Sequence, residues 1–353
     1  MSKGNQRKKE SIHIPNQEKH SQPTQVTSLL DAMVDGREFE SLVQLKNLNV
    51  NALDEIRRSL AELSIVRSRP VIAYLANIVN PNIKASRSID LADDLPFSEL
   101  VNTVPATEKH IDLILVTPGG LGTQVAKFVD KLRRRFETIS FIIPNIAMSA
   151  GTIFAMSGDE IIMTANSYLG PIDPQVPNKD GMYVPAQAIL TLIEEIQTKG
   201  AESLKNGGQP DWTDLQILRQ IDPKEIGNAI NASKYSVELV EKYLDDYKFR
   251  TWVTHSDGRA VTQAEKKQRA NEIANQLCKH ALWKSHGRGI TREAAWDVCR
   301  LKITHSETIG LDRPIRRLWA LFNWIFENST ICKTFVSAHY SLMRNDPSAI
   351  IQK

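Results

Sequence analysis

The 353-residue sequence has few cysteines, and its charges nearly cancel. Cys278, Cys299 and Cys332 are too few and too scattered for a disulfide framework, which favours a reducing, cytoplasmic location. The net charge of +3 gives no argument for nucleic acid or a membrane surface as a partner of the whole chain. No apolar run approaches the roughly 18 residues that span a bilayer, so we expect no transmembrane helix.

Aromatic residues are missing from the first stretch, and apolar ones are sparse there. Residues 1–27 are polar and basic and lack the apolar centre of a signal peptide. They cannot bury enough apolar surface to order themselves, so we predict a disordered basic tail. The basic run would allow contact with RNA or anionic lipid, but a solvated tail is the favoured interpretation. Residues 28–64 are predicted to form a helical lead-in.

Alternating strand and helix patterns occupy residues 65–185. Apolar, β-branched runs at 69–79, 110–116, 138–145 and 159–164 are typical of buried strands. Between two of them, residues 123–136 place apolar side chains three and four positions apart, which predicts an amphipathic helix. This order predicts βαβ units and a parallel sheet.

Helical patterns dominate the rest of the chain. Residues 186–310 are predicted to be a helical region and 311–353 a C-terminal helical extension. Within the extension, "RRLWALFNWIFEN" (316–328) is strongly apolar for a surface helix. It is expected either in the core or at a subunit contact, and the core is favoured.

Ser149, in "NIAMSAGTIFAM", follows a predicted strand and begins a predicted helix. Its neighbours Ala147, Ala150 and Gly151 are small, as in a nucleophile elbow, although the pattern is A-x-S-x-G rather than G-x-S-x-G. A serine that caps the helix N-terminus explains the residue equally well. From this motif alone both interpretations stay open.

Two further segments bear on this serine. "TPGG" (117–120) ends a predicted strand, and its glycines allow backbone N–H groups to point outward as an oxyanion hole. A structural turn is the alternative, whereas "GGLGTQV" matches neither the dinucleotide fingerprint nor the P-loop, so we expect no nucleotide cofactor. In "SYLGPIDPQV" (167–176), Gly170, Pro171 and Asp173 belong to a rigid segment that forms a cleft wall or a plain connection.

Together these motifs resemble the ClpP/crotonase superfamily. "MSAGT", "LGPIDPQ", "TKGAE" and "WTDLQILRQID" are similar to the SDH-type Clp-fold serine proteinases, also called serine dehydrogenase proteinases, which are related to signal peptide peptidase A. The similarity covers roughly residues 65–305. It implies an α/β, ClpP/crotonase-like spiral of parallel strands with a helical C-terminal region. No nicotinamide fingerprint supports an oxidoreductase.

The resemblance also implies site residues. Ser149 lies at the nucleophile position, Gly119, Gly120 and Leu121 lie on the oxyanion turn, and Ala150 lies where the second N–H donor comes from. ClpP uses a histidine about 25 residues after its serine, but the sequence has no histidine between His110 and His255. A Ser-His-Asp triad is therefore not expected.

Signal peptide peptidases use a lysine base, and Lys199 lies about 50 residues after Ser149. A lysine acts as a base only when neutral, which requires burial of its ammonium group. A solvated lysine at a helix end is the alternative interpretation, and Lys205 and Lys179 are further candidates for the base.

Other chemistry is not indicated. The spacing of Cys278, His280 and His286 fits no common zinc pattern, so we expect no metal and interpret the two histidines as surface residues. Asp173 either orients a base or serves as a cap or turn residue.

The sequence thus predicts a serine endopeptidase with a Ser149–Lys199 dyad, acting on polypeptides without a cofactor. A homo-oligomer is expected, and any adaptor is unidentified. The alternatives are a crotonase-type acyl-CoA enzyme, which needs no serine nucleophile, and a catalytically inactive Clp-fold scaffold.

Overall fold

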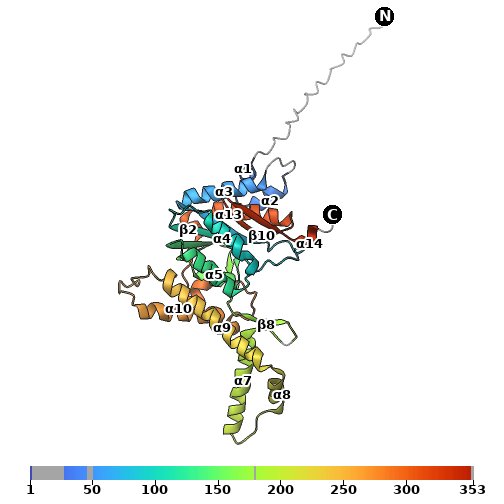
Figure 1. Cartoon of the computed structure of the whole chain (residues 1–353), viewed down its shortest axis with the longest axis vertical. Helices are drawn as coiled ribbons and strands as arrows, with labels where there is room; N and C mark the ends of the chain where they lie inside the picture. Colours follow the sequence, from blue (N-terminus) through green and yellow to red (C-terminus); the bar gives the residue numbers. More distant parts are fainter. Residues whose placement is uncertain (2–27, 46–50, 179, 351–353) are drawn as a thin grey trace.

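A seven-stranded sheet forms the centre of the protein, in the strand order β11-β10-β1-β2-β3-β5-β9 (Figure 1). The computed structural model describes Met1 and residues 28–45, 51–178 and 180–350. Five strands run parallel: β1 (Val71–Ala76), β2 (His110–Val116), β3 (Thr138–Ile143), β5 (Glu160–Met163) and β9 (Thr304–His305). A C-terminal hairpin, β10 (Ile331–Ser337) and β11 (Ser341–Asn345), pairs antiparallel with β1.

Helices cover both faces of this sheet because the side chains of each buried strand alternate between two apolar cores. Ile72 and Tyr74 of β1 point into one core, and Val71 and Leu75 into the other. The first core includes residues of α4 (Asp94–Asn102), α5 (Gly122–Arg133), α6 (Ala150–Met156), α9 (Pro223–Tyr243), α10 (Gln263–Cys278) and α12 (Arg292–Cys299). The second includes residues of α1 (Leu29–Ala32), α2 (Glu38–Val43), α3 (Ala52–Arg67) and α13 (Asp312–Glu327).

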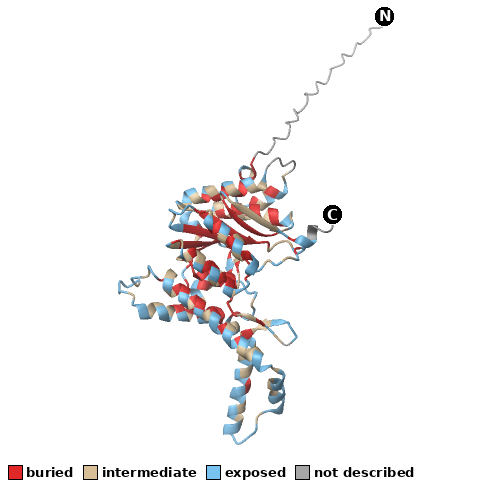
Figure 2. Cartoon of the chain, viewed as in Figure 1, coloured by how far each residue is buried: buried red, intermediate tan, exposed pale blue. Residues whose placement is uncertain are grey.

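An arm extends away from the sheet (Figure 1). It consists of the hairpin β7 (Gln175–Pro177) and β8 (Tyr183–Pro185), α7 (Ala186–Lys205), α8 (Trp212–Gln220) and the first part of α9. Its small apolar core contains Val176, Ala186 and Ala229, and most of its other residues are exposed or only partly buried (Figure 2).

The remaining elements are short. They are η1 (Leu91–Asp93), β4 (Ile146–Ala147), β6 (Tyr168–Leu169), the π-helical η2 (Leu244–Lys248), α11 (His280–Trp283), η3 (Ser306–Ile309) and α14 (Pro347–Ile350). Strands β4 and β6 pair in parallel beside the carboxyl ends of β2 and β3, where the candidate site lies.

The predicted α/β class with a largely parallel sheet is confirmed, as is the helical region that follows it. The disordered tail predicted for residues 1–27 lies outside the described residues, apart from Met1. The helical extension predicted for 311–353 is corrected in its second half. There, "TICKTFVS" is rich in β-branched residues and forms β10, which completes the sheet beside β1.

None of the described helices is long and apolar enough to cross a bilayer.

Candidate active site

Ser149 occupies a backbone conformation that L-residues rarely adopt, with φ of 51° and ψ of −119°. It lies between β4 and α6, and its side chain makes no capping hydrogen bond to that helix. The side chain is half-buried. Helix capping therefore does not explain this serine, whereas a strained strand-to-helix turn is typical of a nucleophile elbow.

Backbone pairing brings the glycine turn next to Ser149. The Thr117 N–H donates to the Ile146 carbonyl (3.0 Å), and the Met148 N–H donates to the Thr117 carbonyl (3.0 Å). Gly119 has a φ of 109°, and a Cβ on it would lie 2.8 Å from the Ser149 Cβ. The turn thus contacts the serine so closely that only glycine fits.

Two of the predicted oxyanion donors are engaged elsewhere. The Gly119 N–H donates to the Thr117 Oγ1 (3.1 Å), and the Leu121 N–H donates to the Ile89 carbonyl (2.9 Å). Neither the Gly120 nor the Ala150 N–H donates to any described residue. Of the four predicted donors, the N–H groups of Gly120 and Ala150 therefore remain available in this conformation.

Gly170 forms part of the wall beside the nucleophile. A Cβ on Gly170 would lie 2.8 Å from the Met148 Cε, and its carbonyl and N–H both bond the Thr152 hydroxyl (2.9 Å each). The Thr152 hydroxyl also lies 2.7 Å from the Ala147 carbonyl, so its one proton is shared between the two carbonyls. The segment Gly170–Pro171 is therefore tied to the start of α6.

Asp173 is fully buried and contacts two histidines. Its carboxylate bonds His280 Nδ1 at 3.0 Å and His286 Nδ1 at 2.9 Å. When Nδ1–H donates to a carboxylate, the Nε2 of the same ring is left able to accept a proton. The side chains of His280 and His286 are 24% and 27% exposed, so both reach the surface as the sequence indicated. Both also bond a buried carboxylate, which the sequence did not indicate.

His286 lines a pocket of about 470 Å³ together with Pro118, Ile146, Met148, Tyr168, Gly287 and Gly289. Pro118 and Met148 directly precede the glycine turn and Ser149. The loop that carries His286 is held against this wall by a pair of backbone hydrogen bonds between Leu169 and Ile290 (3.0 and 2.8 Å). His286 thus faces the same pocket as the nucleophile segment, although no hydrogen bond joins Ser149 to either histidine in this conformation.

The nearby thiol of Cys278 is no competing nucleophile. Burial, with a smaller contribution from the charge of Asp173, raises the pKa of Cys278 to about 12. The thiol therefore stays protonated at neutral pH.

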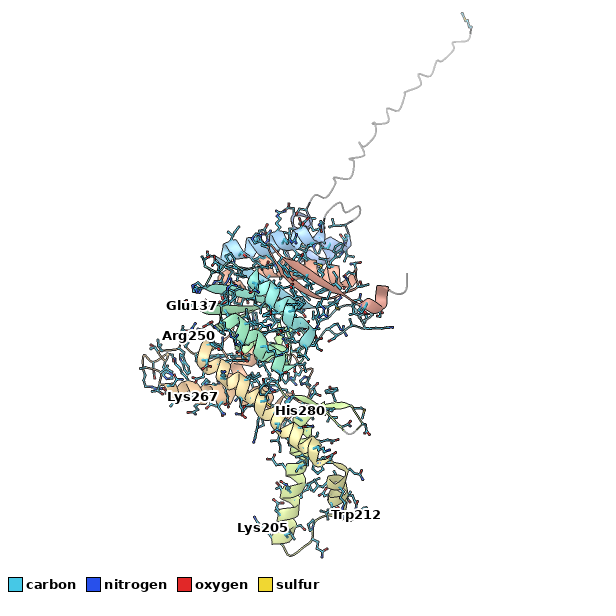
Figure 3. The ribbon with its side chains drawn as sticks, viewed as in Figure 1. Glu137, Lys205, Trp212, Arg250, Lys267 and His280 are labelled. Atoms are coloured by element: carbon cyan, nitrogen blue, oxygen red, sulfur yellow. The ribbon has the colours of Figure 1, made fainter. Side chains whose placement is uncertain are left out.

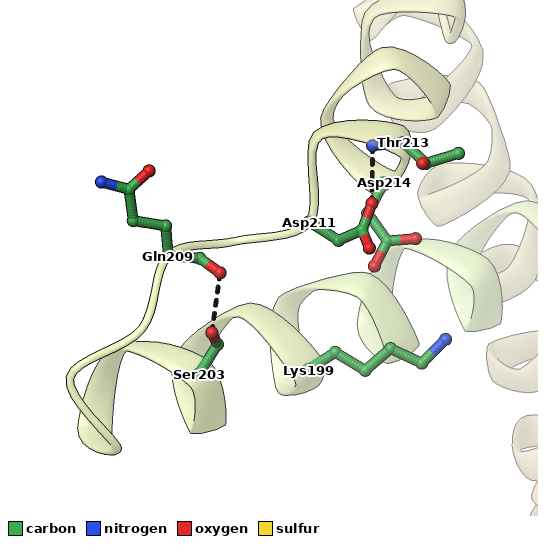
Figure 4. A pocket seen from close by; sticks show the side chains of 6 residues that line it. All are labelled: Lys199, Ser203, Gln209, Asp211, Thr213 and Asp214. Atoms are coloured by element: carbon green, nitrogen blue, oxygen red, sulfur yellow. Dashed lines mark hydrogen bonds between the residues drawn. The ribbon is translucent and has the colours of Figure 1, made fainter.

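Lys199 lies elsewhere, on the arm. It is exposed and lines a separate pocket of about 420 Å³ with Ser203, Gln209, Asp211, Thr213 and Asp214 (Figure 4). Lys205 lies at the far end of the same helix (Figure 3), and Lys179 lies outside the described residues. Nothing in the described part of the chain buries the Lys199 ammonium group, as a lysine base would require.

Sequence reasoning found the serine and the glycine turn because each is a local motif. It missed the histidines because Asp173 meets them across 107 and 113 residues. The local pattern there, Cys-x-His at 278–280, is of the metal-ligand kind and carries no sign of Asp173. Among the described residues, no cluster of acidic residues, histidines and cysteines fits a metal ion.

Comparisons with known proteins give relatives for part of the chain. Two uncharacterized proteins of Methanocaldococcus jannaschii, MJ0137 and MJ1495, are 34% identical over 163 residues and 44% identical over 136 residues. These matches cover 45% and 38% of the chain, and the chain spans only about half the length of the two relatives (52% and 42%).

Two solved structures of the 1510-N membrane-bound stomatin-specific protease, one in complex with a substrate peptide, align with 62% of the chain. The alignments cover 74% and 70% of the solved chains, at 12% and 13% identity and a TM-score of 0.35.

The family model of the ClpP-like SDH-type serine proteinases matches residues 45–232, just over half of the chain, and includes Ser149, the glycine turn and Asp173. The chain belongs to the family of ClpP-like SDH-type serine proteinases.

Proposed function

We propose that this protein hydrolyses peptide bonds as a serine endopeptidase, with Ser149 as nucleophile, His286 as base and Asp173 as the residue that orients His286. The observation that carries the proposal is the strained, uncapped Ser149 packed against the glycine turn, together with the N–H groups of Gly120 and Ala150, which have no partner among the described residues. Such donors act where negative charge develops during acyl transfer.

The chemistry follows from these positions. The Ser149 Oγ attacks the substrate carbonyl carbon while His286 Nε2 takes its proton. The N–H groups of Gly120 and Ala150 hold the resulting oxyanion. His286 then passes the proton to the departing amine, which leaves an acyl-Ser149 ester. Water opens this ester after giving a proton to His286, and that proton returns to the Ser149 oxygen.

Asp173 keeps the imidazole in the required orientation. It bonds Nδ1 of His286, which directs Nε2 away from the carboxylate, and it stabilises the imidazolium formed after proton transfer. We place His286 rather than His280 in the catalytic role because His286 lines the pocket that Met148 also lines. His280 then acts as a second support for the carboxylate.

The pocket favours an apolar substrate side chain. Ile146, Met148 and Tyr168 contribute apolar surface to it, and the described residues that line it include no carboxylate, lysine or arginine. An apolar residue next to the scissile bond would bury its side chain there.

Lys199 is a second candidate for the base, in a Ser149–Lys199 dyad that forms between two copies of the chain. Because Lys199 lies exposed on the arm, it would have to reach the Ser149 of another copy of the chain. A homo-oligomer in which the arm of one protomer meets the core of its partner would provide this.

Peptide hydrolysis by matched variants tests the proposal. With quenched fluorescent peptides, we expect Ser149→Ala to lower kcat at least about a thousandfold and His286→Gln about a hundred- to ten-thousandfold. His280→Gln, which changes the other imidazole on Asp173, should retain activity within about tenfold.

The same series separates the alternatives. If Lys199→Met lost activity and His286→Gln kept it, Lys199 and not His286 would be the general base. A crotonase-type acyl-CoA enzyme would keep its activity in Ser149→Ala, because its oxyanion hole needs no serine nucleophile. Wild-type protein without hydrolysis or labelling of Ser149 by a fluorophosphonate would favour the scaffold.

The three cysteines are free and buried, which supports a reducing, cytoplasmic location as part of this proposal. Polypeptides are the proposed substrates.

A further inference from the structure

Ile89, which lies about 30 residues before the glycine turn, makes two backbone hydrogen bonds across Gly120. The Ile89 N–H donates to the Gly119 carbonyl (2.7 Å), and the Ile89 carbonyl accepts from the Leu121 N–H (2.9 Å). These bonds lie on either side of Gly120, and a Cβ on Gly120 would overlap the Ile89 backbone. The direction of the Gly120 N–H therefore depends on where Ile89 is held.

The residues on either side of Ile89 are bound by a buried lysine, Lys333 of β10. Its Nζ donates to the Ser88 carbonyl (2.6 Å) and to the Asp90 carboxylate (3.0 Å). It also donates to the Asp93 carboxylate (2.8 Å), which is fully buried. The Lys333 side chain is 1% exposed. All three ammonium protons thus have partners close to the segment that carries Ile89.

Two further contacts make this cluster rigid. The Tyr74 hydroxyl and Arg344 both bond the Asp93 carboxylate (2.9 and 3.1 Å). The pKa of Asp90 lies below its usual value, because hydrogen bonds from Lys333 and Ser86 outweigh the effect of burial, which acts to raise it.

The same hairpin holds the segment at its other end. The Asp346 carboxylate, just after β11, accepts hydrogen bonds from the N–H groups of Lys84 (2.5 Å) and Ala85 (3.2 Å). Residues 84–90 are therefore attached to the C-terminal hairpin at two places and to the glycine turn at a third.

We propose that Lys333 is a positioning residue for the oxyanion hole, acting through Ser88, Ile89 and Asp90 on the N–H of Gly120. The role rests on the proposed function, but Lys333 lies outside the residues 45–232 that match the family model. The C-terminal hairpin is thus part of the catalytic apparatus rather than an appended strand pair.

Removing the cation has a defined consequence. With methionine at position 333, the Ser88 carbonyl and the carboxylates of Asp90 and Asp93 lose the hydrogen bonds and the positive charge of Lys333, and the two carboxylates repel each other more strongly. Ile89 then loses its fixed place, and the turn follows it. A displacement of about 1 Å at a catalytic group costs on the order of a hundredfold in rate.

Hydrogen exchange and labelling of the full chain test the proposal together. In Lys333→Met we expect the amides of Ile89 and Leu121 to exchange at least about tenfold faster, measured by mass spectrometry on peptides covering 86–93 and 117–125. The rate of fluorophosphonate labelling at Ser149, and kcat for peptides, should fall about ten- to a hundredfold with KM little changed.

Two companion variants sharpen the experiment. Lys333→Met/Asp93→Asn removes one carboxylate together with the cation and is used if the single variant does not fold. Arg57→Met is the control, because it removes a contact to the same hairpin, at the Ser341 hydroxyl (3.0 Å), and Arg57 bonds none of residues 84–90. It should leave exchange of Ile89 and Leu121 unchanged.

Unchanged exchange at Ile89 and Leu121, or unchanged kcat and labelling in an active, folded Lys333 variant, would overturn the proposal. A different outcome would be faster exchange in Lys333→Met together with a wild type that hydrolyses no peptide. It would contradict the proposed function, but it would establish that Lys333 holds the glycine turn in place.

Discussion

The backbone of Ser149 is strained, and tight contacts with neighbouring residues keep it in that conformation. A non-glycine residue in such a backbone region costs about 1–3 kcal/mol. Gly119 lies against the Ser149 Cβ, and a Cβ on Gly151, the second residue of α6, would overlap the Thr117 side chain. Glycine at position 151 of "MSAGT" is therefore required by the Thr117 side chain, and glycine at position 119 by the close approach of Ser149.

The substitution Gly119→Ala tests this packing. Its new methyl group would press on the Ser149 Cβ, so we expect fluorophosphonate labelling of Ser149 to slow at least about tenfold. The control is Gly258→Ala. Gly258 also has a positive φ (86°), but its Cβ would meet nothing within 4 Å. Equal labelling rates in the two variants would show that the contact with Ser149 does not matter.

At this scale, the sequence predicts what is local. Ser149 and the two glycines stand in short motifs whose backbone demands follow from residue type. The sequence did not predict which N–H groups remain available as oxyanion donors. A residue about 30 positions earlier, Ile89, accepts the hydrogen bond from the Leu121 N–H. The contacts of Asp173 with His280 and His286 depend on how the helices after the arm return to the core, and no local pattern encodes that return.

Among the elements, four of the parallel strands (β1, β2, β3 and β5) were predictable from apolar runs and α5 from its periodicity, whereas β9 and the C-terminal hairpin were not. Lys333 stands in the middle of β10, and a lysine in an apolar run indicates an exposed position. The structure instead buries it against Asp90 and Asp93. A tertiary ion cluster thus reverses the local preference.

The π-helical η2 at the end of α9 carries Lys248, whose pKa is lowered. Burial lowers the pKa of Lys248 to about 8, and the charge of Lys302 contributes. Between pH 8 and 10.5 the unfolded chain binds more protons at this lysine than the folded chain does. The free energy of unfolding therefore rises with pH over that window on account of Lys248.

Lys248→Met should remove this effect. Below pH 8 we expect the variant to be more stable than the wild type by on the order of 1–3 kcal/mol, with the difference shrinking towards pH 10. Urea unfolding of both proteins at several pH values measures it. A stability difference that does not change with pH would contradict the assignment.

The whole molecule consists of a layered α/β core and an arm whose apolar side chains are not all covered. On α8 no residue is buried, and Trp212 and Leu215 are 72% and 43% exposed. Figure 3 shows Trp212 near the outer part of the arm, away from the core. Such exposure on a projecting helix is expected where another copy of the chain packs.

We therefore expect the wild type to sediment as an oligomer and Trp212→Ser/Leu215→Ser to shift it towards the monomer. The control is Ile65→Ser, since Ile65 is 77% exposed on α3, in the core part of the molecule. A wild type that stays monomeric at tens of micromolar would contradict the expectation and would also remove the route by which Lys199 reaches a serine.

The most direct measurement is an experimental structure of the protein after reaction with a fluorophosphonate. The account predicts phosphorus on the Ser149 Oγ, with the phosphonyl oxygen about 2.7–3.1 Å from the backbone nitrogens of Gly120 and Ala150 and His286 Nε2 facing the adduct. An adduct on another residue, or one whose phosphonyl oxygen points away from both nitrogens, would contradict it.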